Sequence, residues 1–210
     1  MRMRKKPWAK AYLETLPQVI FQPETHQGNW AKLLDRTKIH VEIGSGKGDY
    51  CTKMAAMYPE IGWVAIERDA SVSAVALRKC DGILPENMVW IVAEASEIST
   101  WFSQGEISVL HLNFSDPWPK KRYAKRRLTS PNFLPSYLAL LEDEGEIRLK
   151  TDNAGFFEYS VLQCEGYPLM MNEFSVDFRR IEQNEDAISE YEAKFMELGQ
   201  PIYRAVWRKK

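Results

Sequence analysis

The sequence is poor in cysteine and histidine. Its three cysteines, Cys51, Cys80 and Cys164, lie far apart and form no CxxC pair. This spacing argues against a disulfide framework and against a zinc site, and it fits a reducing cytoplasm. The three histidines show no HExxH motif and no paired ligand spacing, so we expect no metal cofactor.

Long apolar runs are also missing. No run approaches the roughly 20 residues that cross a membrane, and the basic N-terminus MRMRKKPWAK is not followed by the apolar core of a secretory signal. We therefore expect no membrane partner and a cytoplasmic location. At 210 residues, with 45% hydrophobic and 27% charged residues, the chain suits one compact domain with a full core.

The net charge of −1 conceals an uneven distribution of charge. Fifteen of the 28 basic residues lie in three windows, 1–10, 120–127 and 204–210, which contain no acidic residue. Segregated cations on an otherwise acidic protein are typical of a surface that binds a polyanion. For each terminus taken alone, fraying into solvent is the simpler explanation.

Strand-like and helix-like segments alternate through most of the chain, which predicts an α/β fold with a doubly wound, mostly parallel sheet. The C-terminal part differs, because two strand-like segments there flank a helical one at 188–198 without a long crossover. We therefore expect seven strands, the last two forming an antiparallel edge hairpin. The predicted strands are 38–44, 61–68, 87–92, 107–114, 145–151, 167–178 and 201–208.

Residues 1–36 have a different character from the rest. Short helical pieces around 8–15 and 29–36 are interrupted by Pro7, Pro17 and Pro23. We expect this segment to be a basic N-terminal arm or cover rather than part of the core, with residues 37–210 as the main domain.

The segment VEIGSGKGD, residues 41–49, follows a predicted strand and opens a predicted helix. Gly44, Gly46 and Gly48 allow a tight turn and let a ligand approach the backbone closely. Asp49 stands where the dinucleotide fingerprint GxGxxG has its third glycine. The spacing therefore argues against a dinucleotide-dependent oxidoreductase.

Acidic residues stand at the ends of three successive predicted strands. Glu42, beside the glycine loop, would repel a pyrophosphate but would favour a cationic ligand. Glu67 is placed to accept hydrogen bonds from a ribose diol, and Glu94 could serve an adenine edge. Each acid alone is more often an ordinary surface residue. Together with the glycine loop they predict a site for S-adenosyl-L-methionine (AdoMet), which has a positive centre, a ribose and an adenine.

The segment LNFSDPWPKKRYAKRR, residues 112–127, joins an apolar strand to a stiff turn and a block of cations. Asp116 and Trp118 each precede a proline, which favours extended backbone angles at both. A carboxylate is thus expected at the carboxyl end of a central strand, where open α/β sheets bind their ligands. The cations that follow predict a polyanion contact, and they are Lys120, Lys121, Arg122, Lys125, Arg126 and Arg127.

These motifs, with KTD at 150–152 and SEYEAKF at 189–195, resemble the bacterial tRNA (guanine-N7-)-methyltransferases over nearly the whole chain. The glycine loop is shared by many methyltransferases, whereas DPWPKxR followed by KRR is specific. The resemblance implies a Rossmann-like class I AdoMet-dependent methyltransferase fold. It also implies methylation of N7 of a guanosine in the tRNA variable loop, at conventional tRNA position 46.

The resemblance also implies roles for individual residues. It assigns Glu42, Glu67, Glu94 and Asp116 to the AdoMet site, which the three glycines complete. It assigns Lys120, Asp152 and four further residues to the tRNA or its target guanine. Those four are Ser189, Glu190, Tyr191 and Glu192. The implied partner is tRNA, no obligate protein partner is implied, and a monomer or a homodimer is compatible.

Two positions depart from the family pattern. Tyr123 stands where histidine is common, which puts in doubt any role for an imidazole there, and Ser189 stands where threonine is usual, which keeps the hydroxyl. Ser189 and Glu192 also form an S-x-x-E capping box at the start of a predicted helix. From the residues alone, this capping role is the better interpretation of that motif.

The chemistry of guanine N7 agrees with the implied reaction. The nitrogen carries an in-plane lone pair, so its attack on a methyl group requires no deprotonation, and a carboxylate stabilises the cationic product. Asp116 is the predicted catalytic residue and Asp152 the alternative. No catalytic cysteine motif of a cytosine-C5 enzyme is present, and DPWP lacks the second aromatic of a DPPY-type loop.

Other functions leave features unexplained. An AdoMet-dependent methyltransferase acting on another RNA is the nearest alternative. An AdoMet enzyme acting on a small molecule or a protein would leave the basic block without a role. A non-catalytic RNA-binding module would need no acids at three strand ends.

Overall fold

The computed structural model describes residues 4–210 of the chain. Arg2, part of the basic window 1–10, lies outside the described residues. The chain divides into two compact units, one ending at Ser103 and the other running from Gln104 to Lys210.

The first unit alternates strands with helices from residue 30 onward, as the sequence predicts. Each expected strand and helix is present within a few residues of its expected bounds. Its elements are α1 (Ala9–Leu13), β1 (Val19–Ile20), the 3-10 helix η1 (Pro23–His26), α2 (Trp30–Leu34), β2 (Lys38–Ile43), α3 (Asp49–Met57), β3 (Ile61–Ile66), α4 (Ala70–Lys79), β4 (Met88–Ile91) and the 3-10 helix η2 (Ala95–Thr100).

The strands of the first unit are parallel and lie in the order β1-β4-β3-β2. From Ile39 onward β2 is buried, as β3 is after its first residue, and β4 is buried throughout. Strands covered on both faces read as continuous apolar runs in the sequence, as β3 and β4 do, whereas β2 alternates Ile39, Val41 and Ile43 with polar residues.

The N-terminal segment contributes to the core of the first unit. Leu13 and Trp30 are fully buried, and the indole N–H of Trp30 donates to the Trp101 carbonyl at 2.7 Å. The ring of Trp30 also stacks on Phe102 at 4.9 Å. The expectation that residues 1–36 lie outside the core is therefore wrong for these side chains. The domain boundary at residue 36 stays a prediction.

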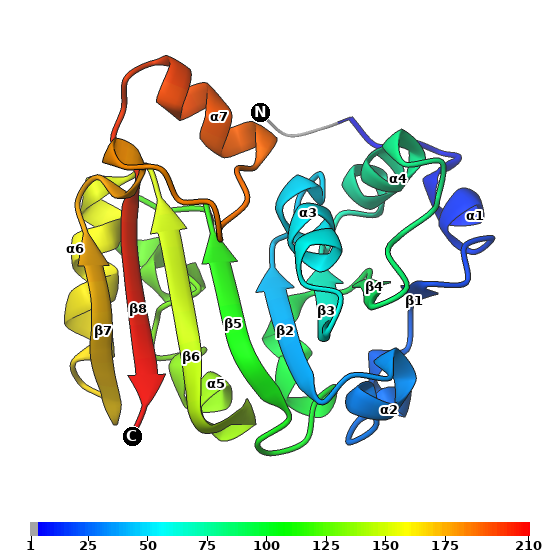
Figure 1. Cartoon of the computed structure of the whole chain (residues 1–210), viewed down its shortest axis with the longest axis horizontal. Helices are drawn as coiled ribbons and strands as arrows, with labels where there is room; N and C mark the ends of the chain where they lie inside the picture. The colour runs from blue at the N-terminus through cyan, green and yellow to red at the C-terminus, as the bar shows by residue number, and fades with distance from the viewer. Residues whose placement is uncertain (1–3) are drawn as a thin grey trace. The chain divides into compact units, whose positions relative to one another are not determined.

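The second unit contains the remaining predicted elements and two 3-10 helices that the sequence pattern does not predict. Figure 1 shows α7 beyond the carboxyl ends of β5 and β6, and β8 running against β6. The elements are β5 (Ile107–Asn113), η3 (Lys121–Arg126), α5 (Leu134–Leu140), β6 (Leu141–Thr151), α6 (Ala154–Cys164), β7 (Leu169–Ser175), η4 (Phe178–Arg180), α7 (Glu190–Glu197) and β8 (Tyr203–Lys209).

The second unit combines parallel and antiparallel strands in the order β5-β6-β8-β7. β5 pairs with β6 in parallel, while β8 pairs in antiparallel fashion with both β6 and β7. All seven residues of β5 are buried, which confirms the predicted buried strand. The predicted antiparallel edge hairpin is also confirmed.

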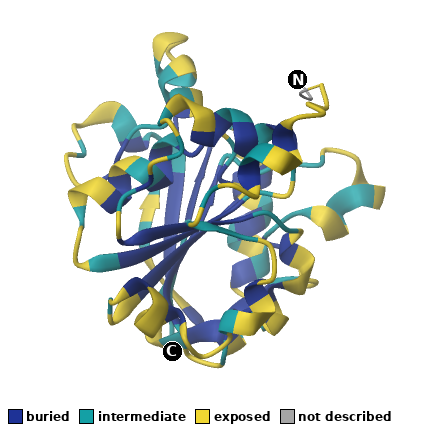
Figure 2. Ribbon diagram, turned by 90° about the vertical axis from the view of Figure 1, so that its right-hand side faces the viewer, coloured by how far each residue is buried: buried dark blue, intermediate teal, exposed yellow. Residues whose placement is uncertain are grey.

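The observed strands differ from the prediction in number and in one boundary. The described residues form eight strands rather than seven, because Val19 and Ile20 pair with Trp90 and Ile91. A two-residue strand has too little periodicity to be predicted. β6 begins at Leu141, directly after α5 and four residues earlier than expected. Figure 2 shows most strands buried along their length and most exposed residues on helices and loops, although the edge strand β7 is largely exposed.

Candidate functional site

The glycine loop connects β2 to α3 and is tied to the end of β3. The backbone N–H groups of Gly44 and Ser45 both donate to the Ile66 carbonyl, at 2.8 and 3.0 Å. Gly44 has a φ of +80°, and no atom lies within 4 Å of the position that a Cβ would take there. The loop therefore leaves open space directly over its backbone at Gly44, where a ligand can approach.

The third glycine of the loop is required for packing. Gly48 precedes α3 with a φ of +77°, and a Cβ at this position would lie 2.6 Å from the ring of Trp90 on β4. A side chain there would displace the indole. The start of α3 can therefore lie close to β4 only with glycine at residue 48.

Glu67 follows β3 and holds the glycine loop. Its carboxylate accepts hydrogen bonds from the backbone N–H of Gly46 at 3.1 Å and of Asp69 at 2.9 Å. Burial raises the pKa of this carboxyl, although the two N–H donors and Arg68 act in the opposite direction. The structure thus brings two predicted AdoMet residues, Glu67 and Gly46, into direct contact.

The other two strand-end glutamates differ in burial. Glu42 is buried in β2. The pKa of the nearby Cys51 thiol is raised, first by the burial of the thiol and second by the charge of Glu42. Glu94 is exposed and forms an ion pair with Arg68 at 3.4 Å. Because Arg68 is the neighbour of Glu67, this pair keeps Glu94 near the end of β3.

In the second unit, β5 leads into a turn that carries Asp116, here called the Asp116 turn (residues 114–119). The turn begins with a hydrogen bond of 2.8 Å from the Phe114 N–H to the Lys150 carbonyl. Asp116 is exposed. Phe114 and Trp118 have positive φ angles of 51° and 42°. The expectation of an extended backbone at Trp118 is therefore wrong.

The basic block (residues 120–127) forms the 3-10 helix η3 and its two ends. Arg126 lies over the rings of Trp118 and Tyr123, with its guanidinium carbon 5.0 and 5.1 Å from the ring centroids. Arg122 lies over Tyr123 at 4.8 Å. Five of the six cations are exposed, while Arg127 is half-buried. Tyr123, which stands where the resembling family often has histidine, therefore contacts two of the predicted substrate-binding arginines, Arg122 and Arg126.

Asp152 and Tyr191 lie near the Asp116 turn. Tyr191 packs against Phe114 with 5.3 Å between ring centroids, and half of its surface is exposed. Burial and the charges of Asp152 and Asp116, in that order, raise the pKa of its hydroxyl. Burial also raises the pKa of Asp152. The predicted catalytic residue, its alternative and a predicted substrate residue thus come together in the second unit.

The capping role predicted for Ser189 is confirmed, but Glu192 does not complete the predicted capping box, because its carboxylate binds Lys150 and Arg179. The Ser189 Oγ accepts a hydrogen bond from the Glu192 N–H at 3.0 Å at the start of α7. The Glu192 side chain is fully buried, and its carboxylate binds Lys150 at 3.1 Å and Arg179 at 2.6 Å. Glu190 forms an ion pair with Lys194 at 3.5 Å. Substrate contacts by Ser189, Glu190 and Glu192 stay predictions.

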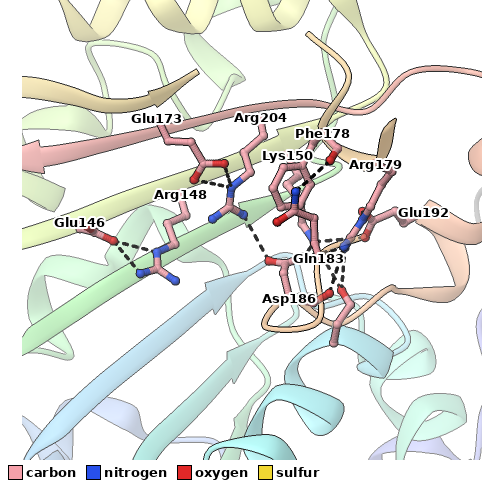
Figure 3. Close-up of polar contacts among 11 residues, drawn as sticks. Glu146, Arg148, Lys150, Glu173, Phe178, Arg179, Gln183, Asp186, Glu192 and Arg204 are labelled. Carbon is pink, nitrogen blue, oxygen red and sulfur yellow. Dashed lines mark hydrogen bonds and ion pairs between the residues drawn. The ribbon is translucent and has the colours of Figure 1, made fainter. Parts of the chain in front are cut away.

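Glu192 belongs to a group of charged side chains, here called the ion cluster, that joins β6, β7, β8, α7 and the segment between β7 and α7 (Figure 3). Lys150 and Arg179 each bind both Asp186 and Glu192. Arg204 binds Asp186 at 3.2 Å and Glu173 at 2.9 Å. The members are Lys150, Glu173, Arg179, Asp186, Glu192 and Arg204.

Charge is balanced within the ion cluster, with three cations facing three carboxylates. Burial alone would raise the pKa of Asp186, but Lys150, Arg204 and Arg179 together hold it below its usual value. The sequence motifs predict no role for Lys150, Arg179 or Asp186. Arg204 lies in the basic window 204–210, and its expected place on a polyanion-binding surface is wrong, because it is buried and paired with Asp186 and Glu173. The only available signal was the apolar context of Lys150 in a predicted strand, because a lysine there requires a buried counter-charge.

Residues 4–210 have neither a membrane-spanning helix nor a group of metal ligands. No helix in this range is both long and apolar enough to cross a membrane. The same residues contain no cluster of three or more histidine, cysteine, aspartate or glutamate side chains arranged to hold a metal ion.

The amino-acid sequence of the chain is similar to that of a family of known proteins. A family model described as a putative methyltransferase matches residues 36–205. The tRNA (guanine-N(7)-)-methyltransferase of Oceanobacillus iheyensis is 45% identical over 97% of both chains. The enzyme of the same name from an Exiguobacterium species is 42% identical over the full length of both.

Solved structures show the same fold at low sequence identity. A 16S rRNA methyltransferase matches 87% of this chain and 93% of its own, with a TM-score of 0.62 and 15% identity. The precorrin-6y C5,15-methyltransferase of Geobacter metallireducens covers 99% and 90%, with a TM-score of 0.56 and 14% identity. The chain has the Rossmann-like class I methyltransferase fold, and it belongs to the family of the bacterial tRNA (guanine-N(7)-)-methyltransferases.

Proposed function

We propose that this protein transfers a methyl group from AdoMet to N7 of a guanosine in the tRNA variable loop, at conventional tRNA position 46. The observation that carries the proposal is the Asp116 turn. It presents an exposed carboxylate beside Asp152 and Tyr191 and leads directly into an exposed block of cations. A carboxylate for a developing cation and a surface for a polyanion are the two requirements of this reaction.

The first unit supplies the residues that would hold AdoMet. The open space over Gly44 admits a ligand close to the backbone, and the fixed carboxylate of Glu67 can accept hydrogen bonds from a ribose diol. Glu42 and Glu94 provide further negative charge for a cationic ligand that carries an adenine. Bound AdoMet supplies an electrophilic methyl group. The residues of this unit proposed to bind it are Glu42, Gly44, Gly46, Gly48, Glu67 and Glu94.

The residues of the second unit act on the guanine. N7 attacks with its in-plane lone pair, so no residue has to remove a proton. Asp116 orients the base and stabilises the positive charge that develops on the ring, which is the kind of preorganised electrostatic effect that accelerates such steps. Asp152 and Tyr191 complete the wall against which the base is held. In-line positioning of N7 and the methyl carbon supplies the remaining acceleration.

The five exposed cations of the basic block bind the tRNA backbone in this proposal. Exposed lysines and arginines bind phosphates with loss of condensed counterions, which makes the affinity dependent on salt. Arg122 and Arg126 also lie over aromatic rings, and stacked arginines keep donors free for phosphate oxygens. The reaction needs tRNA and AdoMet and no obligate protein partner, so a monomer or a homodimer could perform it in the cytoplasm.

The proposal is tested by nucleoside analysis of tRNA after incubation with the protein and methyl-labelled AdoMet. We expect label in 7-methylguanosine, and no label in a matched transcript that carries adenosine at position 46. Label in a different nucleoside of tRNA would overturn the proposal. Label only in another RNA of the cell would favour the alternative, an AdoMet-dependent methyltransferase acting on that RNA.

A further inference from the structure

Arg127 differs from the other cations of the basic block in what its side chain contacts. We propose that Arg127 is a positioning residue that holds the Asp116 turn in place for methyl transfer, and that it does not bind an RNA phosphate. This inference rests on the proposed function, because it concerns the residue proposed to act on guanine. It separates one member of the block from the five exposed cations.

The guanidinium of Arg127 binds two consecutive carbonyl groups of the turn. Its Nε–H donates to the Pro117 carbonyl at 2.9 Å, and its Nη2 donates to the Trp118 carbonyl at 3.1 Å. The guanidinium carbon also lies 4.2 Å from the ring centroid of Tyr159 on α6. The side chain therefore links the Asp116 turn to a helix of the same unit.

The backbone of Arg127 is itself fixed, so its side chain starts from a defined position. The Arg127 N–H donates to the Ala124 carbonyl at 3.0 Å, and the Arg127 carbonyl accepts from the Ser130 N–H at 2.9 Å. Because its backbone N–H and carbonyl are both hydrogen-bonded, Arg127 can hold the neighbouring Asp116 turn through its side chain.

The Asp116 turn needs such support for two reasons. Pro117 and Pro119 have no N–H group, so neither can contribute a backbone hydrogen-bond donor to the turn. Trp118 has a φ of +42°, an uncommon value for a residue other than glycine that persists only when the surroundings impose it. Arg127 binds the Pro117 and Trp118 carbonyls, which flank the α-carbon of Trp118. These two bonds explain why Trp118 departs from the extended backbone predicted before a proline.

Lysine cannot replace arginine in this role. The two carbonyls require two donors in a fixed planar arrangement, and the guanidinium provides this arrangement, whereas an ammonium is a flexible point charge. A phosphate contact, in contrast, is largely kept when arginine is changed to lysine, because the positive charge remains. The Arg127→Lys variant therefore separates the two roles.

The first test uses hydrogen exchange and does not depend on activity. In Arg127→Lys, the backbone amides of Phe114 and Tyr123, which donate to the Lys150 and Lys120 carbonyls at the two ends of the turn, should exchange roughly tenfold faster than in the wild type, because the turn opens more often. Unchanged exchange at these amides would overturn the proposal. The matched control is Arg180→Lys, which makes the same replacement at an exposed arginine outside the basic block.

The second test compares chemistry with binding. In Arg127→Lys, the single-turnover methylation rate at saturating tRNA and AdoMet should fall roughly tenfold to a hundredfold, the usual result of a misplaced catalytic group. In Arg127→Ala, the slope of log Kd for tRNA against log salt concentration should stay at the wild-type value. In Lys125→Ala, that slope should fall by about one unit.

The proposal is wrong if Arg127→Ala lowers the salt slope as Lys125→Ala does while Arg127→Lys methylates at the wild-type rate. That result would make Arg127 an ordinary phosphate contact. Failure of the proposed function would look different, because wild-type protein would then form no 7-methylguanosine in tRNA. The exchange measurement on the Asp116 turn would still decide the role of Arg127 in that case.

Discussion

The ion cluster and the basic block are both rich in lysine and arginine, and both lie in the second unit, yet they use these residues in opposite ways. In the ion cluster three cations meet three carboxylates, and Lys150 and Glu192 have exposed fractions of only 1% and 0%. In the basic block five cations are exposed, and residues 120–127 include no acid.

The difference shows that residue type alone does not decide what a charge does. Charges that are neutralised inside the chain fix its own elements, here the start of α7 against β6 and β8. Charges that remain exposed, including those of the basic block and of Asp116, are available to ligands. Arg127 belongs by sequence to the basic block, but like the cations of the ion cluster it contacts groups of the chain itself, in this case two carbonyls and an aromatic ring.

Removing a cation from the ion cluster should have the largest effect. Lys150→Met leaves Asp186 and Glu192 without one of their shared partners, and breaking a buried ion pair typically destabilises a protein by about 3–5 kcal/mol. For a chain of this size we expect the melting temperature to fall by roughly 6–20 °C. Thermal unfolding checks this, with Lys121→Met in the basic block as the control, which should shift stability by less than about 0.5 kcal/mol.

Removing the charge of Asp116 should affect the reaction rather than the fold. Asp116→Asn keeps the shape of the side chain, so single-turnover methylation with both ligands saturating should slow by about 10²-fold or more. Asp143→Asn, an exposed aspartate at the start of β6, is the control. A rate within a few-fold of the wild type would show that Asp116 only shapes its turn, and Asp152 would become the better candidate.

Removing Glu67 should weaken cofactor binding. Glu67→Ala loses a charge-assisted acceptor for the ribose diol, which is typically worth about 1.5–3 kcal/mol, or roughly ten- to a hundredfold in affinity. Titration calorimetry with AdoMet measures the effect, and Glu60→Ala, an exposed glutamate before β3, serves as the control. An unchanged dissociation constant for Glu67→Ala would remove this residue from the site.

Removing exposed cations from the basic block should change the salt dependence of tRNA binding. Replacing Lys120, Lys121 and Lys125 by alanine should lower the slope of log Kd against log salt by about 0.7–0.9 for each phosphate that the protein no longer neutralises. A control triple on the first unit, Lys32, Lys38 and Lys53, removes the same charge. If both triples give the wild-type slope, the basic block is only solvated.

The smallest effect concerns acid stability. The cations around Asp186 lower its pKa in the folded state, so its contribution to stability is present above the unfolded pKa and is lost as the pH falls through the lower folded value. Wild-type melting temperature should therefore fall from about pH 5 downward more steeply than that of Asp186→Asn. Parallel pH dependences of the two proteins would show that Asp186 is not stabilised as an anion.

The strands and the glycine loop could be predicted because local pattern determines them. β3, β4 and β5 are mostly apolar runs and β2 alternates apolar with polar residues. A glycine or an acid follows shortly after each, and their order along the chain implies parallel pairing. The positions of Gly46 and Glu67 at adjacent strand ends follow from the same order, and their contact follows in turn.

The ion cluster could not be predicted, because its members come from segments between residues 150 and 204 that meet only in the folded chain. The strand context of Lys150 indicates a buried lysine, but nothing local identifies its partners or distinguishes Asp186 from other acids in the segment before α7. The backbone at Trp118 could not be predicted for the same reason, since the local preference before proline is overcome by hydrogen bonds from a residue nine positions later. The burial of Trp30 and Leu13 likewise depends on tertiary packing.

The central claim is that the chain separates charges that hold its fold from charges that it offers to ligands. Urea unfolding of Lys150→Met beside Asp116→Asn, followed through the same signal, tests it most directly. We predict that Lys150→Met loses about 3–5 kcal/mol of unfolding free energy, while Asp116→Asn stays within about 0.5 kcal/mol of the wild type. Equal losses in the two variants would contradict the claim.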